Sequence, residues 1–140
     1  MKLIMNRLKQ FFVACLAGIS LTACVPESVN NGGSALAGKW MLQTMNGAAP
    51  KAPLSLDVNT DDGSVRGFSG CNRFFARAQM TGETQLRVSK IGSTKKLCSD
   101  GAMMNTERAY LNALKGVSSY SISGNKLSLS GSAGNLVFTK

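Results

Sequence analysis

The chain has 140 residues, enough for one compact domain but not for two. Sixteen Lys and Arg stand against seven Asp and Glu, a formal charge of +9, while aromatic residues make up only 6% of the chain. Because the positive residues are scattered and few aromatic residues lie among them, this composition argues against nucleic-acid binding and favours an anionic membrane surface or a generally solvated exterior. The chain has no His, the commonest general acid–base group, which argues against an enzyme.

The first 23 residues are typical of a targeting segment. Positive residues at Lys2, Arg7 and Lys9 precede an apolar run over Phe11–Leu21. This run is shorter than the about 20 apolar residues that a permanent membrane helix needs. We therefore expect Met1–Ala23 to be a signal peptide that is removed on export.

The segment Leu21-Thr22-Ala23-Cys24 resembles the bacterial lipobox. In proteins with that motif the cysteine thiol receives diacylglycerol, the signal peptide is cut before the cysteine, and the new amine is acylated, commonly with palmitate. The resemblance implies lipidation of Cys24, and several acyl chains on one residue make attachment effectively permanent. Val25, in place of Asp, implies the outer membrane, with the domain facing the periplasm. The alternative is a secreted protein with an incidental cysteine.

After the lipid site, residues 24–36 are polar and rich in glycine, which predicts a flexible tether. From residue 37 the sequence consists of short segments in which apolar and polar residues alternate, separated by turn residues. This pattern predicts one domain over residues 37–140. The alternation places an apolar set on the inner face of the sheet: Trp40, Leu42, Leu54, Leu56, Val58, Leu86, Val88, Leu127, Leu129 and Phe138. The predicted strands are 39–45, 54–58, 64–68, 72–80, 85–91, 117–123, 126–130 and 136–139.

One helix interrupts the strands. Asp100 can cap a helix that runs to Lys115, and Gly116 supplies the stop. About eight evenly spaced strands and one helix favour a small antiparallel barrel or sandwich. The helix has an apolar stripe formed by Met103, Tyr110, Leu111 and Leu114.

The signal peptide and the lipid site account for two of the four cysteines. Cys15 lies in the signal peptide and Cys24 carries lipid, which leaves Cys71 and Cys98 in an oxidising compartment. We expect these two to form a disulfide that closes a loop of about 26 residues and stabilises the fold by roughly 3.5 kcal/mol. A redox-active pair is the alternative. Without His or a Cys-x-x-Cys spacing, no metal site is expected.

Several segments together carry a family resemblance: Gly38-Lys39-Trp40, the run from Gly67 through Cys71-Asn72-Arg73-Phe74, Thr94, Cys98, Glu107, Leu111-Asn112-Ala113-Leu114 and Leu127-Ser128-Leu129. The chain resembles the META domain family, the group that includes HslJ-like heat-shock lipoproteins. The resemblance implies a small, lipocalin-like antiparallel β-barrel with a helix packed against one opening, a place in the bacterial envelope, and stress response in some members. It implies no catalytic activity.

Two pairs of residues are candidates for contact with a ligand or partner. Asn72 and Arg73 could hold a carboxylate or phosphate through the guanidinium fork. Alternatively, Asn72 satisfies backbone groups of a turn, and Arg73 bonds strand carbonyls or an acidic side chain. Met103 and Met104 could line an adaptable apolar mouth, or they are simply core.

The sequence thus predicts a lipid-anchored, monomeric envelope module that binds or scaffolds without catalysis and without a metal or cofactor. Its expected partners are the membrane, another envelope protein or an anionic lipid, and not nucleic acid. The alternative is a periplasmic carrier of an acyl chain in the barrel lumen. A filled lumen would favour the module, and a continuous apolar pocket would favour the carrier.

Overall fold

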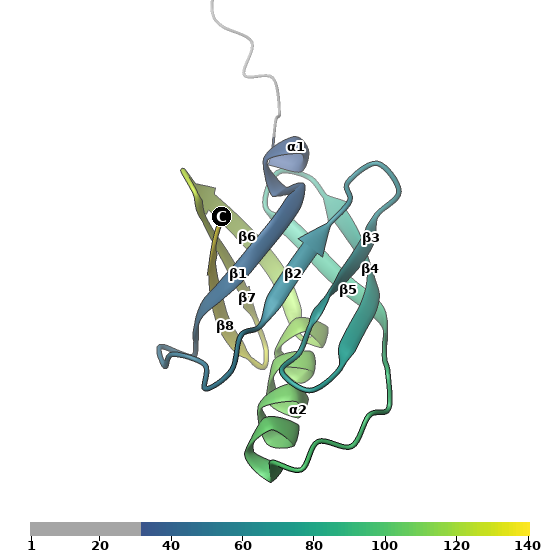
Figure 1. The fold of residues 1–140 in the computed structure, drawn as a ribbon. Helices are drawn as coiled ribbons and strands as arrows, with labels where there is room; N and C mark the ends of the chain where they lie inside the picture. Colours follow the sequence, from purple (N-terminus) through teal and green to yellow (C-terminus); the bar gives the residue numbers. More distant parts are fainter. Residues whose placement is uncertain (1–31) are drawn as a thin grey trace, which may run out of the picture.

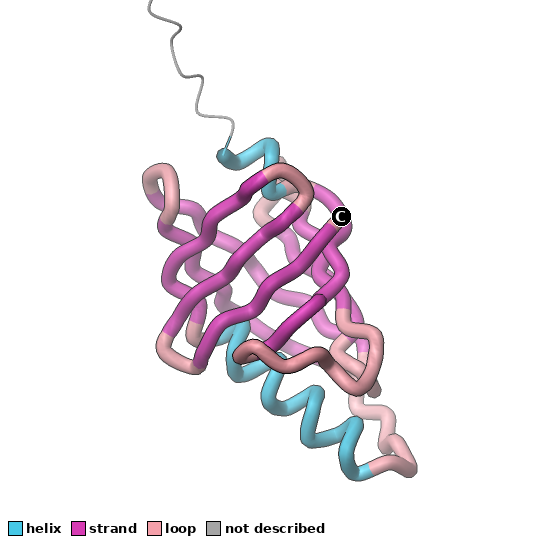
Figure 2. Tube along the Cα trace, turned by 90° about the vertical axis from the view of Figure 1, so that its left-hand side faces the viewer, coloured by secondary structure: helices cyan, strands magenta, loops and turns pink. Residues whose placement is uncertain are grey.

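Eight antiparallel strands, each bonded to the next along the chain, close into a barrel with a long helix at one end (Figures 1 and 2). The computed structural model describes residues 32–140; the predictions for the signal peptide and for Cys24 lie outside the described residues. The expected mainly β, lipocalin-like barrel is confirmed. Its strands are β1 (Gly38–Met45), β2 (Ser55–Val58), β3 (Ser64–Phe68), β4 (Arg73–Thr81), β5 (Gln85–Ser93), β6 (Val117–Ser123), β7 (Lys126–Gly131) and β8 (Gly134–Thr139).

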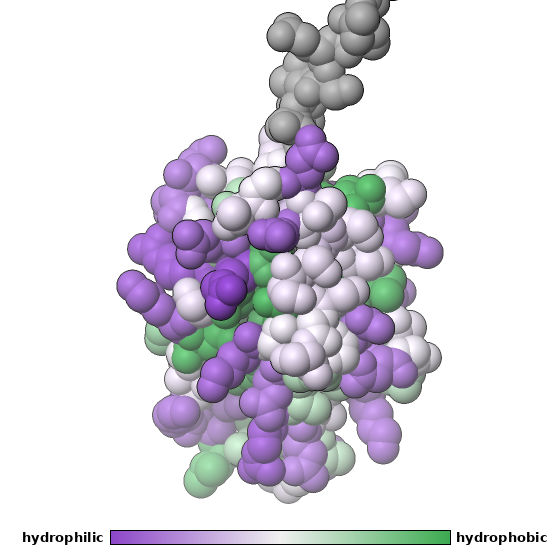
Figure 3. All heavy atoms as spheres, turned by 180° about the vertical axis from the view of Figure 1, so that it is seen from behind, coloured by the Kyte–Doolittle hydropathy of each residue, from purple (hydrophilic) through white to green (hydrophobic). Residues whose placement is uncertain are grey.

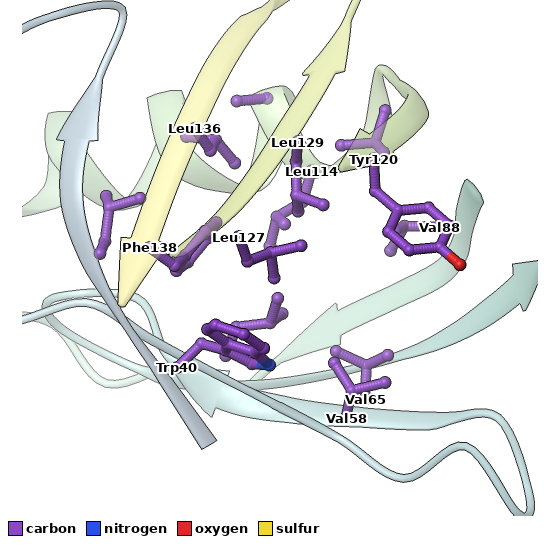
Figure 4. Packing of buried hydrophobic residues seen from close by; sticks show 14 of the residues in the cluster. Trp40, Val58, Val65, Val88, Leu114, Tyr120, Leu127, Leu129, Leu136 and Phe138 are labelled. Carbon is purple, nitrogen blue, oxygen red and sulfur yellow. The ribbon is translucent and has the colours of Figure 1, made fainter. Parts of the chain in front are cut away.

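Alternation along the strands separates the inside of the barrel from the outside. In β1, Trp40 and Leu42 are buried while Lys39 and Met41 are exposed. Every residue that the sequence pattern assigned to the inner face is buried. Figure 4 shows side chains from different strands meeting in the core, among them Trp40, Val58, Val88, Leu127, Leu129 and Phe138. The strands themselves begin or end within one or two residues of the predicted bounds. The lumen is therefore the hydrophobic core.

The barrel closes most narrowly between β5 and β6. Gln85 and Ser119 are the one pair of register partners there, supported by a 2.8 Å hydrogen bond from the Tyr120 N–H to the Thr84 carbonyl. Every other pair of neighbouring strands is in register over four or more residues. The helix α2 (Gly101–Lys115) separates β5 from β6 in the sequence and packs against β5.

Both ends of α2 are capped as predicted. The Asp100 carboxylate accepts a 2.8 Å hydrogen bond from the Ala102 N–H, and the Gly116 N–H donates to carbonyls of the last turn. Of the predicted stripe, Tyr110 and Leu114 are buried, whereas Met103 and Leu111 are only half-buried. Leu111 still packs against the core; Met104, beside Met103, is half-buried as well. The residues that α2 buries are Glu107, Tyr110, Ala113 and Leu114.

The aromatic ring of Tyr110 fills the end of the barrel that α2 covers. It meets Phe74 edge-on, with ring centroids 5.7 Å apart, and lies 6.4 Å from the ring of Phe138. Its hydroxyl donates a 3.2 Å hydrogen bond to the carbonyl of Ser55 on β2. Burial raises the pKa of the Tyr110 hydroxyl, because the anion would have to form out of contact with water.

A second, short helix, α1 (Gly32–Leu36), lies at the opposite end of the barrel from α2 (Figures 1 and 2). Leu36 is fully buried, and its carbonyl accepts a 2.8 Å hydrogen bond from the Trp40 indole N–H. The tether predicted over residues 24–36 is therefore wrong in its last residues: burial of one leucine outweighs the glycine-rich composition. Neither α1 nor α2, the helices among the described residues, is long and apolar enough to cross a membrane.

The C-terminal residue holds α1 in place. The Lys140 ammonium donates hydrogen bonds of 3.2 and 2.7 Å to the carbonyls of Ala35 and Ala37. It also lies 4.4 Å from the ring centre of Trp40, within the range of a cation–π interaction. The first and last described residues thus close the same end of the barrel.

Candidate functional site

The segment between β3 and β4 is held by a buried carboxylate from α2. Glu107 accepts hydrogen bonds from the Ser69 hydroxyl at 2.8 Å, the Asn72 backbone N–H at 2.7 Å and the Asn72 side-chain amide at 3.0 Å. All three residues are buried. A carboxylate that accepts three donors in this way fixes the loop on the helix rather than offering a free acid for chemistry.

Asn72 connects this loop to the chain that follows β5. Its amide oxygen accepts hydrogen bonds of 2.8 Å from the Thr94 hydroxyl and from the Lys96 N–H. Its amide nitrogen donates to the Lys96 carbonyl at 3.1 Å as well as to Glu107. Two donors and two acceptor positions are the full capacity of an amide side chain, so Asn72 has none left for a ligand. This geometry matches the structural alternative for Asn72.

The disulfide strengthens the same junction. Cys71 and Cys98 are bonded, with Cα atoms 6.0 Å apart, and the predicted pairing is confirmed. The bond joins the β3–β4 loop to the approach to α2. Cys71 is buried and Cys98 is half-buried. Burial of one sulfur favours a structural role over a redox-active pair, because thiol–disulfide exchange requires access to the sulfur under attack.

Arg73 follows Asn72 but lies on the opposite side of the chain, in solvent. Its backbone pairs with Thr94, whereas its guanidinium makes no hydrogen bond or ion pair with any residue of the described part of the chain. The structural alternative for Arg73, a bond to a strand carbonyl or an acid, is therefore not what the structure has. Of the two candidate contact residues, only Arg73 is available to a ligand.

Arg73 lines a groove on the outside of the barrel. The groove has a volume of about 590 Å³ and runs over β1, β2, β3 and β4. It combines basic side chains with two of the large hydrophobic residues that remain exposed, Phe68 and Phe75. We call it the outer groove and define it by Lys39, Asp57, Arg66, Phe68, Arg73 and Phe75.

A second hollow of about 770 Å³ follows the narrow closure between β5 and β6. Its lining is mostly polar, with Leu86 and Val117 as apolar members. Figure 3, which shows the molecule from behind, has a strip of hydrophobic surface near its middle and smaller hydrophobic spots towards its edges, among hydrophilic and near-neutral residues. The outer groove is therefore the better candidate site, because it pairs exposed aromatic rings with concentrated charge.

Sequence reasoning missed two features of this region. Glu107 was noticed as part of the family resemblance but not as a buried group, although it is three residues before Tyr110 and seven before Leu114 on the helix. That spacing places it on the apolar stripe and was the available signal. The outer groove was missed because it depends on how β3 and β4 pair. Within residues 32–140, no three metal-ligating side chains gather in one place.

Solved structures share this fold. An NMR structure of a protein from Burkholderia xenovorans is 24% identical, with a TM-score of 0.64 over 79% of this chain and 86% of that one. A second NMR structure is 20% identical, with a TM-score of 0.61 over 76% of this chain and 92% of the other. A crystal structure of a DUF4847 family protein from Bacteroides vulgatus is 14% identical, with a TM-score of 0.54 over 74% and 92% of the two chains.

At these identities the likeness shows the fold alone, and no curated protein matches the chain. The family model of the META domain, however, matches residues 34–140, which include all eight strands and α2. The match begins inside α1, in agreement with the burial of Leu36. The closed barrel, the helix over its end and this match lead to one conclusion: the chain belongs to the META domain family.

Proposed function

We propose that this protein is a lipid-anchored protein of the bacterial outer membrane whose META domain faces the periplasm. There the domain acts as a non-enzymatic binding or scaffolding module linked to envelope stress tolerance. The lipobox-like segment that ends at Cys24 supports the anchor. The Cys71–Cys98 bond supports an oxidising compartment, because disulfides persist in such compartments and are rare in the cytosol.

The filled lumen is the observation that carries the proposal of a binding module. Trp40, Tyr110 and Phe138 have no exposed surface. The Tyr110 and Phe138 rings lie together at the end of the barrel that α2 covers, and the Trp40 ring lies beside α1 at the other end. A carrier of an acyl chain needs a continuous apolar cavity of several hundred cubic ångströms, on the order of 300 Å³ or more. These rings stand where that cavity would have to lie. The packing therefore favours binding on the outer surface over carriage in the lumen.

Replacement of Cys24 tests the anchor. In cells, Cys24→Ser should abolish incorporation of a palmitate analogue and move the protein from the membrane fraction to the soluble fraction. Cys15→Ser is the matched control, because it removes a thiol from the same segment outside the lipobox, and it should change neither property. Membrane retention of the Cys24→Ser protein would contradict the proposed anchor.

A complementation experiment tests the link to envelope stress. A strain that lacks the protein should survive heat and detergent less well than its parent, and wild-type protein should restore survival. The Cys24→Ser protein, expressed at the same level, should not restore it, because the module would no longer be held at the membrane. Equal survival of the deletion strain and its parent under both stresses would contradict this part of the proposal.

A further inference from the structure

The outer face of β3 and β4 alternates cations with exposed aromatic rings. Arg66 is the register partner of Phe75, and Phe68 is the register partner of Arg73. Because residues two apart along a strand point to the same side of the sheet, these four side chains form one square on the exterior. Phe75 is 58% exposed and Phe68 is 37% exposed, so both rings offer apolar surface to the solvent.

Packing against neighbouring strands accounts for only part of the surface of these four side chains. The Phe75 ring lies against Gly92 on β5, where a Cβ atom would overlap it, yet more than half of the residue stays exposed. The Arg73 guanidinium has no polar partner between residues 32 and 140. Exposed rings beside an unpaired cation such as Arg73 are typical of surfaces that bind a partner or a lipid interface.

The charge of the outer groove favours an anionic partner. Asp57 is the register partner of Lys39 on one side and of Arg66 on the other, so one carboxylate faces the groove's three cations. Next to the groove, β4 adds Arg77 and the β2–β3 turn adds Asp61 and Asp62, so the excess of positive charge falls from two to one. The groove is thus net positive between its two aromatic rings.

The topology argues against a peptide that binds by strand addition as the occupant. A peptide that binds a sheet by strand addition needs an unpaired edge to supply main-chain hydrogen bonds. Every strand of the outer groove, from β1 to β4, is paired on both sides in the closed barrel. A lipid surface needs no such edge, because it offers phosphates to the cations and an apolar boundary to the rings.

We infer that the outer groove docks on an anionic phospholipid surface, with Phe68 and Phe75 at the headgroup–acyl boundary and Arg66 and Arg73 on the phosphates. This inference rests on the proposed attachment at Cys24. The chain from that residue to the start of α1 at residue 32 spans at most about 25–30 Å when extended. That reach is similar to the length of a nine-residue strand such as β4, so the side of the barrel can lie on the same membrane. Tethering also makes a weak contact sufficient, because binding becomes intramolecular.

Vesicle binding by the mature chain, residues 24–140 carrying Cys24→Ser, tests the inference without the lipid anchor and without the apolar signal peptide. Vesicles of phosphatidylcholine alone are compared with vesicles that also contain phosphatidylglycerol. Replacing Arg66 and Arg73 together by Gln should weaken binding to the anionic vesicles by roughly tenfold or more. The matched control replaces Arg87 on β5 and Lys126 on β7 by Gln, which gives the same net charge away from the groove. All variants share the same N-terminal segment, so its contribution cancels in the comparison.

A second readout reports on the groove itself. Trp40 is the only tryptophan and is fully buried, so Phe75→Trp adds one reporter on the surface. Brominated lipids in anionic vesicles should quench the tryptophan placed at position 75 and leave the wild-type emission unchanged. Circular dichroism of each variant confirms that it is folded before binding is compared.

Three outcomes would overturn the inference. Equal weakening by the groove pair and the control pair would show general electrostatic attraction only. Bound protein whose tryptophan at position 75 is not quenched would place another surface on the lipid. Binding of polyglutamate that depends on Arg66 and Arg73, without any preference for anionic vesicles, would indicate an acidic protein partner instead. None of these outcomes bears on the proposed lipidation of Cys24, which the fractionation of the Cys24→Ser protein tests separately.

Discussion

The backbone N–H of Asn72 donates a 2.7 Å hydrogen bond to the carboxylate of Glu107, thirty-five positions further along the chain. This bond connects the loop before β4 to the middle of α2. The Ser69 hydroxyl and the Asn72 side-chain amide bind the same carboxylate. One buried acid therefore joins the helix to the loop through three hydrogen bonds.

Glu107→Gln should destabilise the fold by about 2–4 kcal/mol. Glutamine has an NH2 group where glutamate has a second oxygen, so at least one of the three donors would face another donor and lose its hydrogen bond. Chemical denaturation measures this loss as a lower midpoint. The same change at the exposed Glu83, in the turn after β4, is the control and should be nearly neutral. Equal, small effects at both positions would show that the buried network is not important for stability.

Cys98→Ala should lower the free energy of unfolding by about 2–5 kcal/mol, because the unfolded chain is no longer constrained by the bond to Cys71. A reductant should destabilise the wild-type protein to a similar extent and should have no further effect on the variant. If the reductant leaves the wild-type midpoint unchanged although free thiols appear, the bond does not stabilise the fold.

The hydrogen bonds of Glu107 with the β3–β4 loop were harder to predict from the sequence than the barrel was. Alternation at Trp40 and Leu42, and the capping residues Asp100 and Gly116, act locally, so they could be interpreted one segment at a time. Burial of Glu107 requires donors from a loop that only folding brings near, and a charged residue in isolation predicts exposure. The succession of strands along the sequence therefore predicted the barrel, but it did not predict the contacts between the β3–β4 loop and α2.

Two further features, α1 and the outer groove, could not be predicted from the sequence, for different reasons. Residues 32–36 read as a linker, because a five-residue segment that begins Gly-Gly has low helix propensity; burial of Leu36 overrides it. The outer groove depends on register: a shift of one residue between β3 and β4 would turn Arg66 away from Phe75. The exposure of Arg73 was predictable as one alternative, whereas its aromatic neighbours were not.

Gly67→Ala should destabilise the barrel by about 1–3 kcal/mol or more, because the added methyl group would collide with the Ser55 carbonyl and the Phe74 ring. Gly101→Ala is the matched control: no atom lies within 4 Å of its new methyl group, and alanine favours the first turn of α2. Thermal unfolding should therefore show a large fall for the first variant and little change or a rise for the second. A reversed order would contradict the close packing of β2, β3 and β4.

Tyr110 should make the fold sensitive to alkaline pH. Burial holds the pKa of its hydroxyl well above the ordinary value of about 10, so the unfolded chain ionises first. This contribution to stability is complete below about pH 10 and falls as the pH rises further. Tyr110→Phe should cost about 1 kcal/mol near neutrality through the lost hydrogen bond to Ser55 and should then lose stability less steeply in alkali. Urea midpoints measured across the alkaline range give both slopes, and identical slopes would contradict the prediction.

The proposed function requires that ligands bind outside a filled barrel. Quenching of the Trp40 fluorescence by a brominated ligand tests this most directly. The side chain is the only tryptophan of the chain and lies fully buried in the lumen. Titration of the full chain with a brominated fatty acid should leave its emission unchanged, because bromine quenches only at contact. Saturable quenching with one fatty acid per protein would place an acyl chain in the lumen and contradict the account.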